Sequence, residues 1–255
     1  MSYKQTTIGI LGGIGPEATG NFYLKLIKEI QKQKLVNSNT DYPHIIINSI
    51  PAPELTSNIN GAKLNTYIEG VKSLERYEAN FIVMVCNTIH LYHGLLQKEV
   101  SVPILNLRDT VREFLKDEKL KSISIFGTPA SIQNGLYKFN GIKYHNPKNK
   151  DLEQLSLAIE NFNKGHEREK QIVKVIKLAD KYIKKDSEVV IMGCTEISLM
   201  LADSQIPKID TMDILVKATV KYLKKIIKSK GRPPSTTCPT NGRSFRRKNS
   251  RRIAL

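Results

Sequence analysis

Two short apolar runs, one in each half of the chain, constrain the fold most. Phe81–Val85 and Val189–Gly193 are rich in β-branched residues, and each is followed at once by a cysteine, Cys86 or Cys194. Runs of this length and composition predict buried strands. Continuous apolar strands are typical of parallel sheets, in which ligands bind at the carboxyl ends of the strands. We therefore expect both cysteines at such ends.

Similar apolar runs alternate with amphipathic segments along the whole chain. This alternation predicts an α/β fold with parallel sheets covered on both faces. The pattern restarts near residue 122, so the chain reads as two related α/β units. Strands are predicted at 7–11, 44–48, 81–85, 102–106, 122–126, 189–192 and 206–210. Helices are predicted at 17–34, 60–78, 89–98, 152–163, 167–184, 196–202 and 212–229.

The net charge of +16 is unevenly distributed. Residues 231–255 carry six arginines, one lysine and no acid, together with Pro-Pro and little apolar patterning. This composition predicts a disordered basic tail, either an extension foreign to the natural protein or a native arm. The remaining residues lack aromatics interleaved on a basic face, so we expect no nucleic-acid binding through the body.

Other bulk features indicate a protein of the cytoplasm. No run of about 18 apolar residues occurs, so no membrane span is expected. The chain starts without a secretory apolar segment. Three widely spaced cysteines form no disulfide framework, which favours a reducing compartment.

The two strand-end cysteines have two interpretations. A lone cysteine after an apolar strand is most often a small buried hydrophobe. Two in matched settings favour chemistry, because backbone N–H groups at a following helix start stabilise a thiolate. Opposed thiols could take a proton from one face of a carbon and return one to the other, which inverts a stereocentre.

A glycine-rich turn follows the first predicted strand. Gly13–Ala18 matches G-x-G-x-x-A, a dinucleotide fingerprint, but Asn48 stands where the ribose-binding acid is expected. The glycines, Gly13 among them, could instead let the backbone approach a small carboxylate.

Three further polar residues outside the cysteine runs are candidates. His90 and His93 lie three apart with no cluster of ligands beside them, so zinc is not expected. His90 either tunes the first thiol or is a solvated helical histidine. Lys164, before Gly165, is either solvated or directed at a substrate carboxylate.

Three motifs together resemble the aspartate/glutamate racemase family. They are Gly9–Thr19, Val85–His90 and Met192–Ile197, and the likeness spans residues 7–229. The resemblance implies two pseudo-symmetric parallel-sheet α/β domains with the active site in the cleft between them. The implied division is 1–104 plus 209–230 for the first domain, 105–208 for the second, and 231–255 for the tail.

The resemblance also implies the chemistry, a 1,1-proton transfer on an amino acid with no cofactor and no metal. Cys86 and Cys194 would be the two acid/bases, and the protein would form a homodimer. Glu196 and His90 would tune the thiols. The substrate would be held by Asn87, Thr88, Thr195, Lys164, Thr128 and Gly13.

The substrate is less well defined than the reaction. Gly12, Gly13 and Glu196 favour the aspartate-racemase-like branch, hence interconversion of L- and D-aspartate or glutamate. Pro53, however, stands near the place where aspartate racemases often have an arginine for the side-chain carboxylate. A maleate cis–trans isomerase-like enzyme and a non-catalytic amino-acid-binding or regulatory relative remain alternatives.

Overall fold

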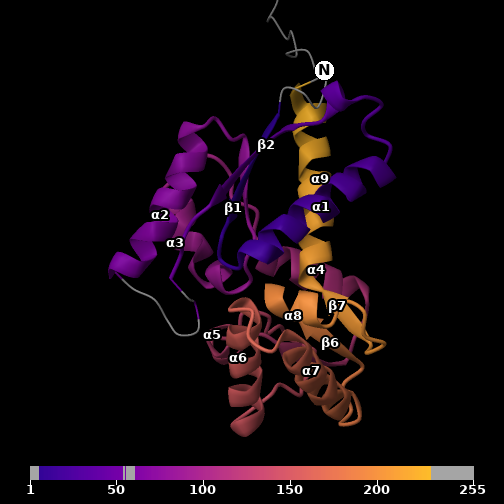
Figure 1. Cartoon of the computed structure of the whole chain (residues 1–255). Coiled ribbons are helices and arrows are strands. Elements are labelled where there is room, and N and C mark those ends of the chain that lie inside the picture. The colour runs from indigo at the N-terminus through magenta and orange to yellow at the C-terminus, as the bar shows by residue number, and fades with distance from the viewer. Residues whose placement is uncertain (1–5, 54, 56–60, 231–255) are drawn as a thin grey trace, which may run out of the picture.

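The computed structural model describes residues 6–53, 55 and 61–230. Its strands form two sheets in which every pairing is parallel, as predicted (Figure 1). The first sheet has the order β2-β1-β3 and the second β5-β4-β6-β7. The strands are β1 (Thr7–Gly12), β2 (His44–Ser49), β3 (Phe81–Met84), β4 (Ser122–Phe126), β5 (Lys143–Tyr144), β6 (Val189–Met192) and β7 (Lys208–Asp210).

Helices connect the strands and cover the sheets. The long last helix packs against the first helix and against the helix that follows residue 106 (Figure 1). The helices are α1 (Pro16–Lys32), α2 (Gly61–Arg76), α3 (His93–Lys98), α4 (Leu107–Asp117), α5 (Pro129–Gln133), α6 (Lys150–Asn163), α7 (Arg168–Ile183), α8 (Thr195–Met200) and α9 (Thr211–Lys230). Two 3-10 turns, η2 (Asn39–Asp41) and η3 (Thr88–Tyr92), complete the described elements.

The cysteine-tipped strands lie in the centre of the core. All four residues of β3 and all four of β6 are buried, which explains their continuous apolar runs. β3 pairs with β1, and β6 pairs with both β4 and β7. One apolar cluster includes residues of both sheets and of α9, namely Ile8, Ile10, Val83, Ile125, Ile191, Leu215 and Leu223 among others.

Several expected elements differ in the structure. The strand expected at 102–106 is reduced to a single parallel bridge between Ile82 and Ile104. Pro103 lacks the N–H of a full ladder, although its carbonyl still accepts from Ile82. The helix expected at 89–98 is divided into η3 and α3. Helices α4 and α5 were not expected.

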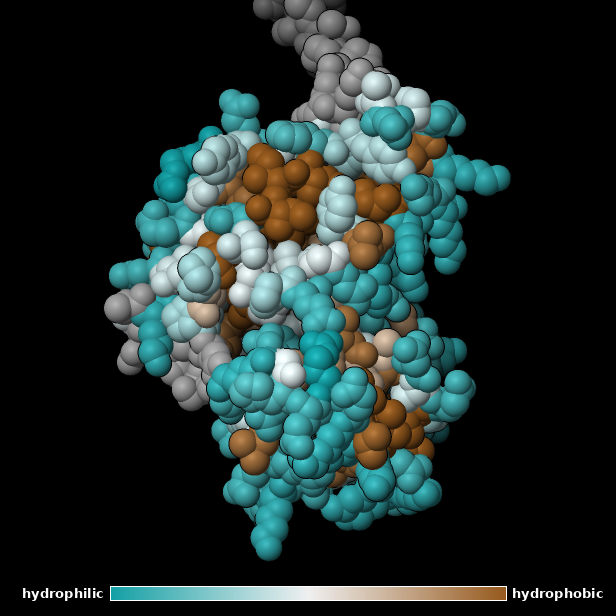
Figure 2. Space-filling view, viewed as in Figure 1, coloured by the Kyte–Doolittle hydropathy of each residue, from teal (hydrophilic) through white to brown (hydrophobic). Residues whose placement is uncertain are grey.

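The edge strand β2 leaves an apolar side chain in solvent. Ile47 on β2 is 40% exposed, and Figure 2 shows a hydrophobic area over this part of the first sheet. No helix in the described part of the chain is long and apolar enough to cross a membrane. The domain bounds given above stay a prediction, and the predicted tail, 231–255, lies outside the described residues.

Candidate active site

The structure brings Cys86 and Cys194 into one small cavity. Each cysteine lies just beyond the carboxyl end of its strand, β3 or β6, and lines a space of about 90 Å³. Both are nearly buried, with 8% and 4% of their surface exposed. The other lining residues are Gly13, Ile14, Gly15, Ala52, Pro53, Leu55, Thr88, Thr128, Ile159, Glu160, Asn163 and Glu196.

The surroundings of Cys86 shift the pKa of its thiol in both directions. The pKa of its thiol is raised to about 12, mainly by burial and to a smaller extent by the charge of Glu196. The backbone N–H groups of Ile89 and Thr88 lower this pKa, because they stabilise a thiolate. These N–H groups are free to do so because they lie in the first turn of η3, which begins two residues after the cysteine.

Cys194 instead forms a pair with a carboxylate. Its Sγ–H donates to Oε2 of Glu196 at 2.8 Å, and the Thr195 hydroxyl donates to the same oxygen at 3.1 Å. Burial and then the negative charge of Glu196 raise the pKa of Cys194. Burial also raises the pKa of Glu196. The thiol and the carboxyl therefore compete for one proton, and they titrate as a pair.

The glycine-rich turn closes over Glu196. Gly13 has φ +86°, and a Cβ there would lie 2.2 Å from the Ile50 carbonyl oxygen. Gly15 has φ +104°, and a Cβ there would lie 2.5 Å from Oε1 of Glu196. Glycine is required at both positions by backbone conformation and by space. A carboxylate so close to the turn would repel a pyrophosphate, which disfavours the dinucleotide interpretation.

Two threonines meet across the cavity. The hydroxyls of Thr88 and Thr128 lie 2.9 Å apart and are buried. Thr128 also caps α5, since its Oγ1 accepts from the Ser131 N–H at 3.2 Å. Both hydroxyls line the cavity beside the cysteines, so hydrogen-bonding groups from both halves of the chain are available to an occupant.

Asn87 lies next to Cys86 but does not line the cavity. Its Oδ1 accepts from the Tyr137 hydroxyl and lies 2.9 Å from Oγ1 of Thr211. Tyr137 and Thr211 are buried and were missed by the sequence analysis. No local pattern could have found them, because they are separated from Asn87 by 50 and 124 residues. Asn87 thus holds together three distant segments beside the first thiol.

The predicted residue Lys164 lies outside the cavity lining. It follows the last residue of α6, and its Nζ donates to Oε1 of Glu160, which does line the cavity. Glu160 and Asn163 were also missed by the sequence analysis. The available signal was their position one residue after Ile159 and Phe162, on the edge of the apolar face of an amphipathic helix.

His90 is buried away from the cavity. Its Nδ1 accepts from the Leu107 N–H, and its Nε2 faces the Met84 carbonyl, both at 3.4 Å. Burial, followed by the nearby His93, lowers the pKa of His90 to about 3. The imidazole is therefore neutral, and it joins the end of β3 to the start of α4.

An ion pair joins α1 to α7 near the cavity. The Arg168 guanidinium contacts both carboxylate oxygens of Glu17, at 2.7 and 2.9 Å. The guanidinium carbon also lies 3.8 Å from the centroid of the Phe162 ring. Glu17 is close enough to the site that its charge raises the pKa of Glu196. The two halves of the chain are therefore tied together beside the cysteines.

Two carboxyl groups are the charged side chains of the described cavity lining. The described lining residues include Glu160 and Glu196 but no lysine or arginine. Ala52 and Pro53 line the cavity at the place where the sequence lacks an expected arginine. The rest of the lining is mainly apolar or small.

Comparisons with known proteins agree with this fold. The Asp/Glu/Hydantoin racemase family model matches residues 11–219. The broad specificity amino-acid racemase RacX of Bacillus subtilis (strain 168) is 31% identical over 224 residues, which cover 84% of this chain and 96% of that protein.

Two solved structures are also similar. An aspartate racemase homologue from Pyrococcus horikoshii OT3 is 27% identical, with a TM-score of 0.66 over 86% of this chain and 100% of that one. The Picrophilus torridus aspartate racemase has a TM-score of 0.71 over 86% of this chain and 94% of that one, at 22% identity. The fold is therefore the two-domain α/β fold of racemases. This chain belongs to the Asp/Glu/hydantoin racemase family, and the resemblance stated from the sequence is confirmed.

Proposed function

We propose that this protein racemises amino acids by two-base proton transfer between Cys86 and Cys194, without a cofactor. The observation that carries the proposal is the arrival of two strand-end thiols, one from each sheet, in one small cavity. Amino-acid racemisation needs an acid and a base on opposite faces of the α-carbon. The family membership supports the reaction class.

In this proposal Glu196 accepts the proton of the Cys194 thiol. The Cys194 proton moves to Glu196 over the 2.8 Å contact, which leaves a thiolate. This thiolate takes the α-proton, and the Cys86 thiol gives its proton to the opposite face. Cys194 is then a thiol and Cys86 a thiolate, ready for the reverse reaction. The ammonium of a bound amino acid brings a positive charge that favours either thiolate.

The carboxylate of the substrate needs hydrogen-bond donors while negative charge develops at the α-carbon. Thr88 and Thr128 line the cavity and offer hydroxyls from both halves of the chain. The Gly13 turn contributes backbone beside them. In this proposal Thr195 orients Glu196 through its 3.1 Å hydrogen bond, and Asn87 fixes the backbone after Cys86. His90 supports the same strand end.

The cavity favours a side chain that is neutral or basic over aspartate or glutamate. The described lining offers two carboxylates and no cation, so a side-chain carboxylate would be repelled. Lys164 is a candidate to neutralise an acidic substrate, but it already donates to Glu160. The relative RacX is named as a racemase of broad specificity. We therefore infer a range of amino-acid substrates, with the acidic pair as the weakest members.

We also propose a homodimer in which the edge strand β2 takes part. Exposed apolar side chains on an unpaired strand edge favour pairing with another chain, and Ile47 is 40% exposed there. The substitution Ile47→Lys is expected to lower the molecular mass measured by light scattering from two chains to one. If the variant keeps the mass of two chains, β2 does not form the interface.

The experiment that tests the function is a panel of L-amino acids in deuterium oxide. Lysine, glutamine, alanine, aspartate and glutamate would be followed by chiral chromatography and by deuterium at the α-carbon. The proposal expects inversion with exchange, faster for lysine and glutamine than for aspartate. Binding without exchange would instead indicate a non-catalytic amino-acid-binding protein. Conversion of maleate to fumarate would indicate the isomerase alternative.

A further inference from the structure

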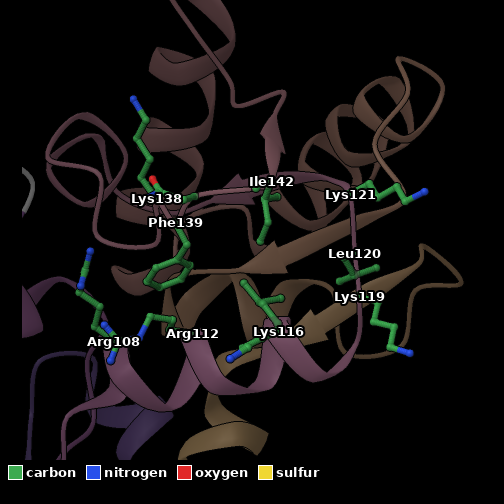
Figure 3. A pocket seen from close by; sticks show the side chains of 12 residues that line it. Arg108, Arg112, Lys116, Lys119, Leu120, Lys121, Lys138, Phe139 and Ile142 are labelled. Carbon is green, nitrogen blue, oxygen red and sulfur yellow. The ribbon is translucent and has the colours of Figure 1, made fainter.

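A second concave region lies between α4 and residues 138–142 (Figure 3). It encloses about 640 Å³, a volume in the range of small-molecule sites. None of its lining residues lines the cysteine cavity. We call it the basic groove, after the six cationic side chains that line it: Arg108, Arg112, Lys116, Lys119, Lys121 and Lys138.

The positive charge of the basic groove is poorly balanced. No aspartate or glutamate is among its described lining residues. Arg112 pairs with Asp109 at 2.9 Å, whereas the four lysines have no described carboxylate within ion-pair distance. Charges of one sign around a concave surface focus the potential and attract counter-ions.

The floor of the groove is apolar and fixed. Figure 3 shows Phe139 and Ile142 pointing toward the helix that carries Arg108, Arg112 and Lys116. The Phe139 N–H donates to the Tyr144 hydroxyl at 2.7 Å. The Arg108 guanidinium lies 5.1 Å from the centroid of the Phe139 ring, and its Nε donates to the Leu136 carbonyl at 2.9 Å. The groove is thus preformed, with cations around an apolar base.

A second groove shows that this charge pattern is not common to the whole surface. Residues of α4 and α9 line a space of about 800 Å³ that includes Lys217 and Lys221 among its lysines. That groove also contains Glu113 and Asp117. The two grooves lie on the same lysine-rich protein, but only the basic groove has a lining of one sign among the described residues.

We propose that the basic groove binds a small anion that carries several phosphate groups. Arg112 and Lys116, which face the groove from α4, would contact the phosphates, since guanidinium and ammonium groups are the usual phosphate ligands. A flat or apolar part of the ligand would lie on Phe139. Leu136, which holds Arg108, precedes Tyr137, and Tyr137 donates to Asn87 beside Cys86. An occupant would therefore contact the segment that leads to the active site.

Calorimetric titration of the full chain in 150 mM NaCl tests the proposal, with ATP and sodium tripolyphosphate as probes. The variant Arg112→Gln/Lys116→Gln removes two exposed charges from the groove. The control Lys217→Gln/Lys221→Gln removes two exposed charges from the groove between α4 and α9. We expect the first variant to bind at least tenfold more weakly than the wild type, and the control to stay within twofold.

Each outcome has a definite meaning. Tighter binding of ATP than of tripolyphosphate identifies a nucleotide-like ligand, and equal binding identifies a free polyphosphate; both support the site. Absence of binding to the wild type overturns the proposal. An equal loss in both variants also overturns it, because the attraction would then depend only on net charge. None of these binding measurements requires racemase activity.

Discussion

The two cysteine-tipped strands are alike in sequence, but their surroundings differ in charge. Cys86 faces the N–H groups of Thr88 and Ile89, which favour a thiolate. Cys194 donates to the carboxylate of Glu196, which favours a thiol unless the proton moves to that carboxylate. The same position at the end of a strand therefore produces two different acid/base groups. The difference comes from Glu196, because the matching position after Cys86 holds Thr88, which carries no charge.

The two strand ends also differ four residues after the cysteine. His90 stands at this position after Cys86, buried and neutral. Ser198 stands there after Cys194 and donates to Oδ1 of Asp210 at 2.7 Å. The imidazole of His90 therefore titrates in the acidic range, whereas the hydroxyl of Ser198 does not.

The largest expected effect comes from removing either thiol. Cys86→Ala and Cys194→Ala should each lower racemisation about 10³-fold or more, because general acid–base groups contribute on that scale. Each variant keeps one thiol, which still faces one side of the α-carbon. Deuterium exchange without inversion should therefore persist for one enantiomer, and for opposite enantiomers in the two variants.

The third cysteine provides the control for these variants. Cys238→Ala should keep full activity. Exchange of the same enantiomer in both alanine variants would contradict the assignment of one thiol to each face.

A smaller loss is expected when the carboxylate beside Cys194 is neutralised. Glu196→Gln keeps the shape but cannot take the thiol proton, so kcat should fall about 10²-fold with little change in KM. Glu160→Gln is the matched control, because Glu160 lines the same cavity and contacts Lys164 rather than a thiol. Equal losses of kcat in both variants would show that Glu196 acts only through the charge of the cavity.

The strands and the two thiols could be predicted because their signals are local. A run of four buried residues in a parallel sheet appears in the sequence as a continuous apolar stretch, and the cysteine stands two positions after its last residue. The strand expected around Ile104 failed because Pro103 limits its ladder to one bridge. Helix α4 carried a usable signal, with Leu107, Val111 and Leu115 on one face, but its charged residues obscured it.

The surroundings of the thiols could not be predicted in the same way. Asn87 is held by Tyr137 and Thr211, and these contacts arise only when the second sheet and α9 pack against the first. The acidic side chains of the cavity likewise include Glu160, which α6 brings from the other half of the chain. Sequence neighbours pointed to the two thiols, while the folded chain determines the groups that surround them.

The buried His90 should make the free energy of unfolding fall as the pH is lowered. Its pKa is about 3 in the folded protein and about 6.5 when unfolded, so between these values the unfolded state binds more protons. The free energy of unfolding should then fall by up to about 1.4 kcal/mol for each pH unit below 6.5 from this group.

Urea unfolding at pH 7, 6 and 5 measures this slope. His90→Gln removes the titrating group and should flatten the slope, although it lowers stability at pH 7. His44→Gln, at an exposed position on β2, should keep the wild-type slope. Parallel slopes for the His90 variant and the wild type would place the acid sensitivity elsewhere in the chain.

The smallest expected effect comes from the ion pair between the two halves. Arg168 and Glu17 are partly exposed, so their attraction is screened and of the order of 1 kcal/mol or less. Arg168→Gln should raise KM about two- to fivefold at low salt with kcat nearly unchanged, because the pair joins α1 to α7 without touching a thiol. In 0.5 M NaCl the difference from the wild type should shrink. Lys170→Gln breaks a pair with Glu167 that stays within the second half, and it should change neither constant. A loss of kcat in the Arg168 variant would instead mean that this contact sets the position of Glu196, whose pKa Glu17 already raises.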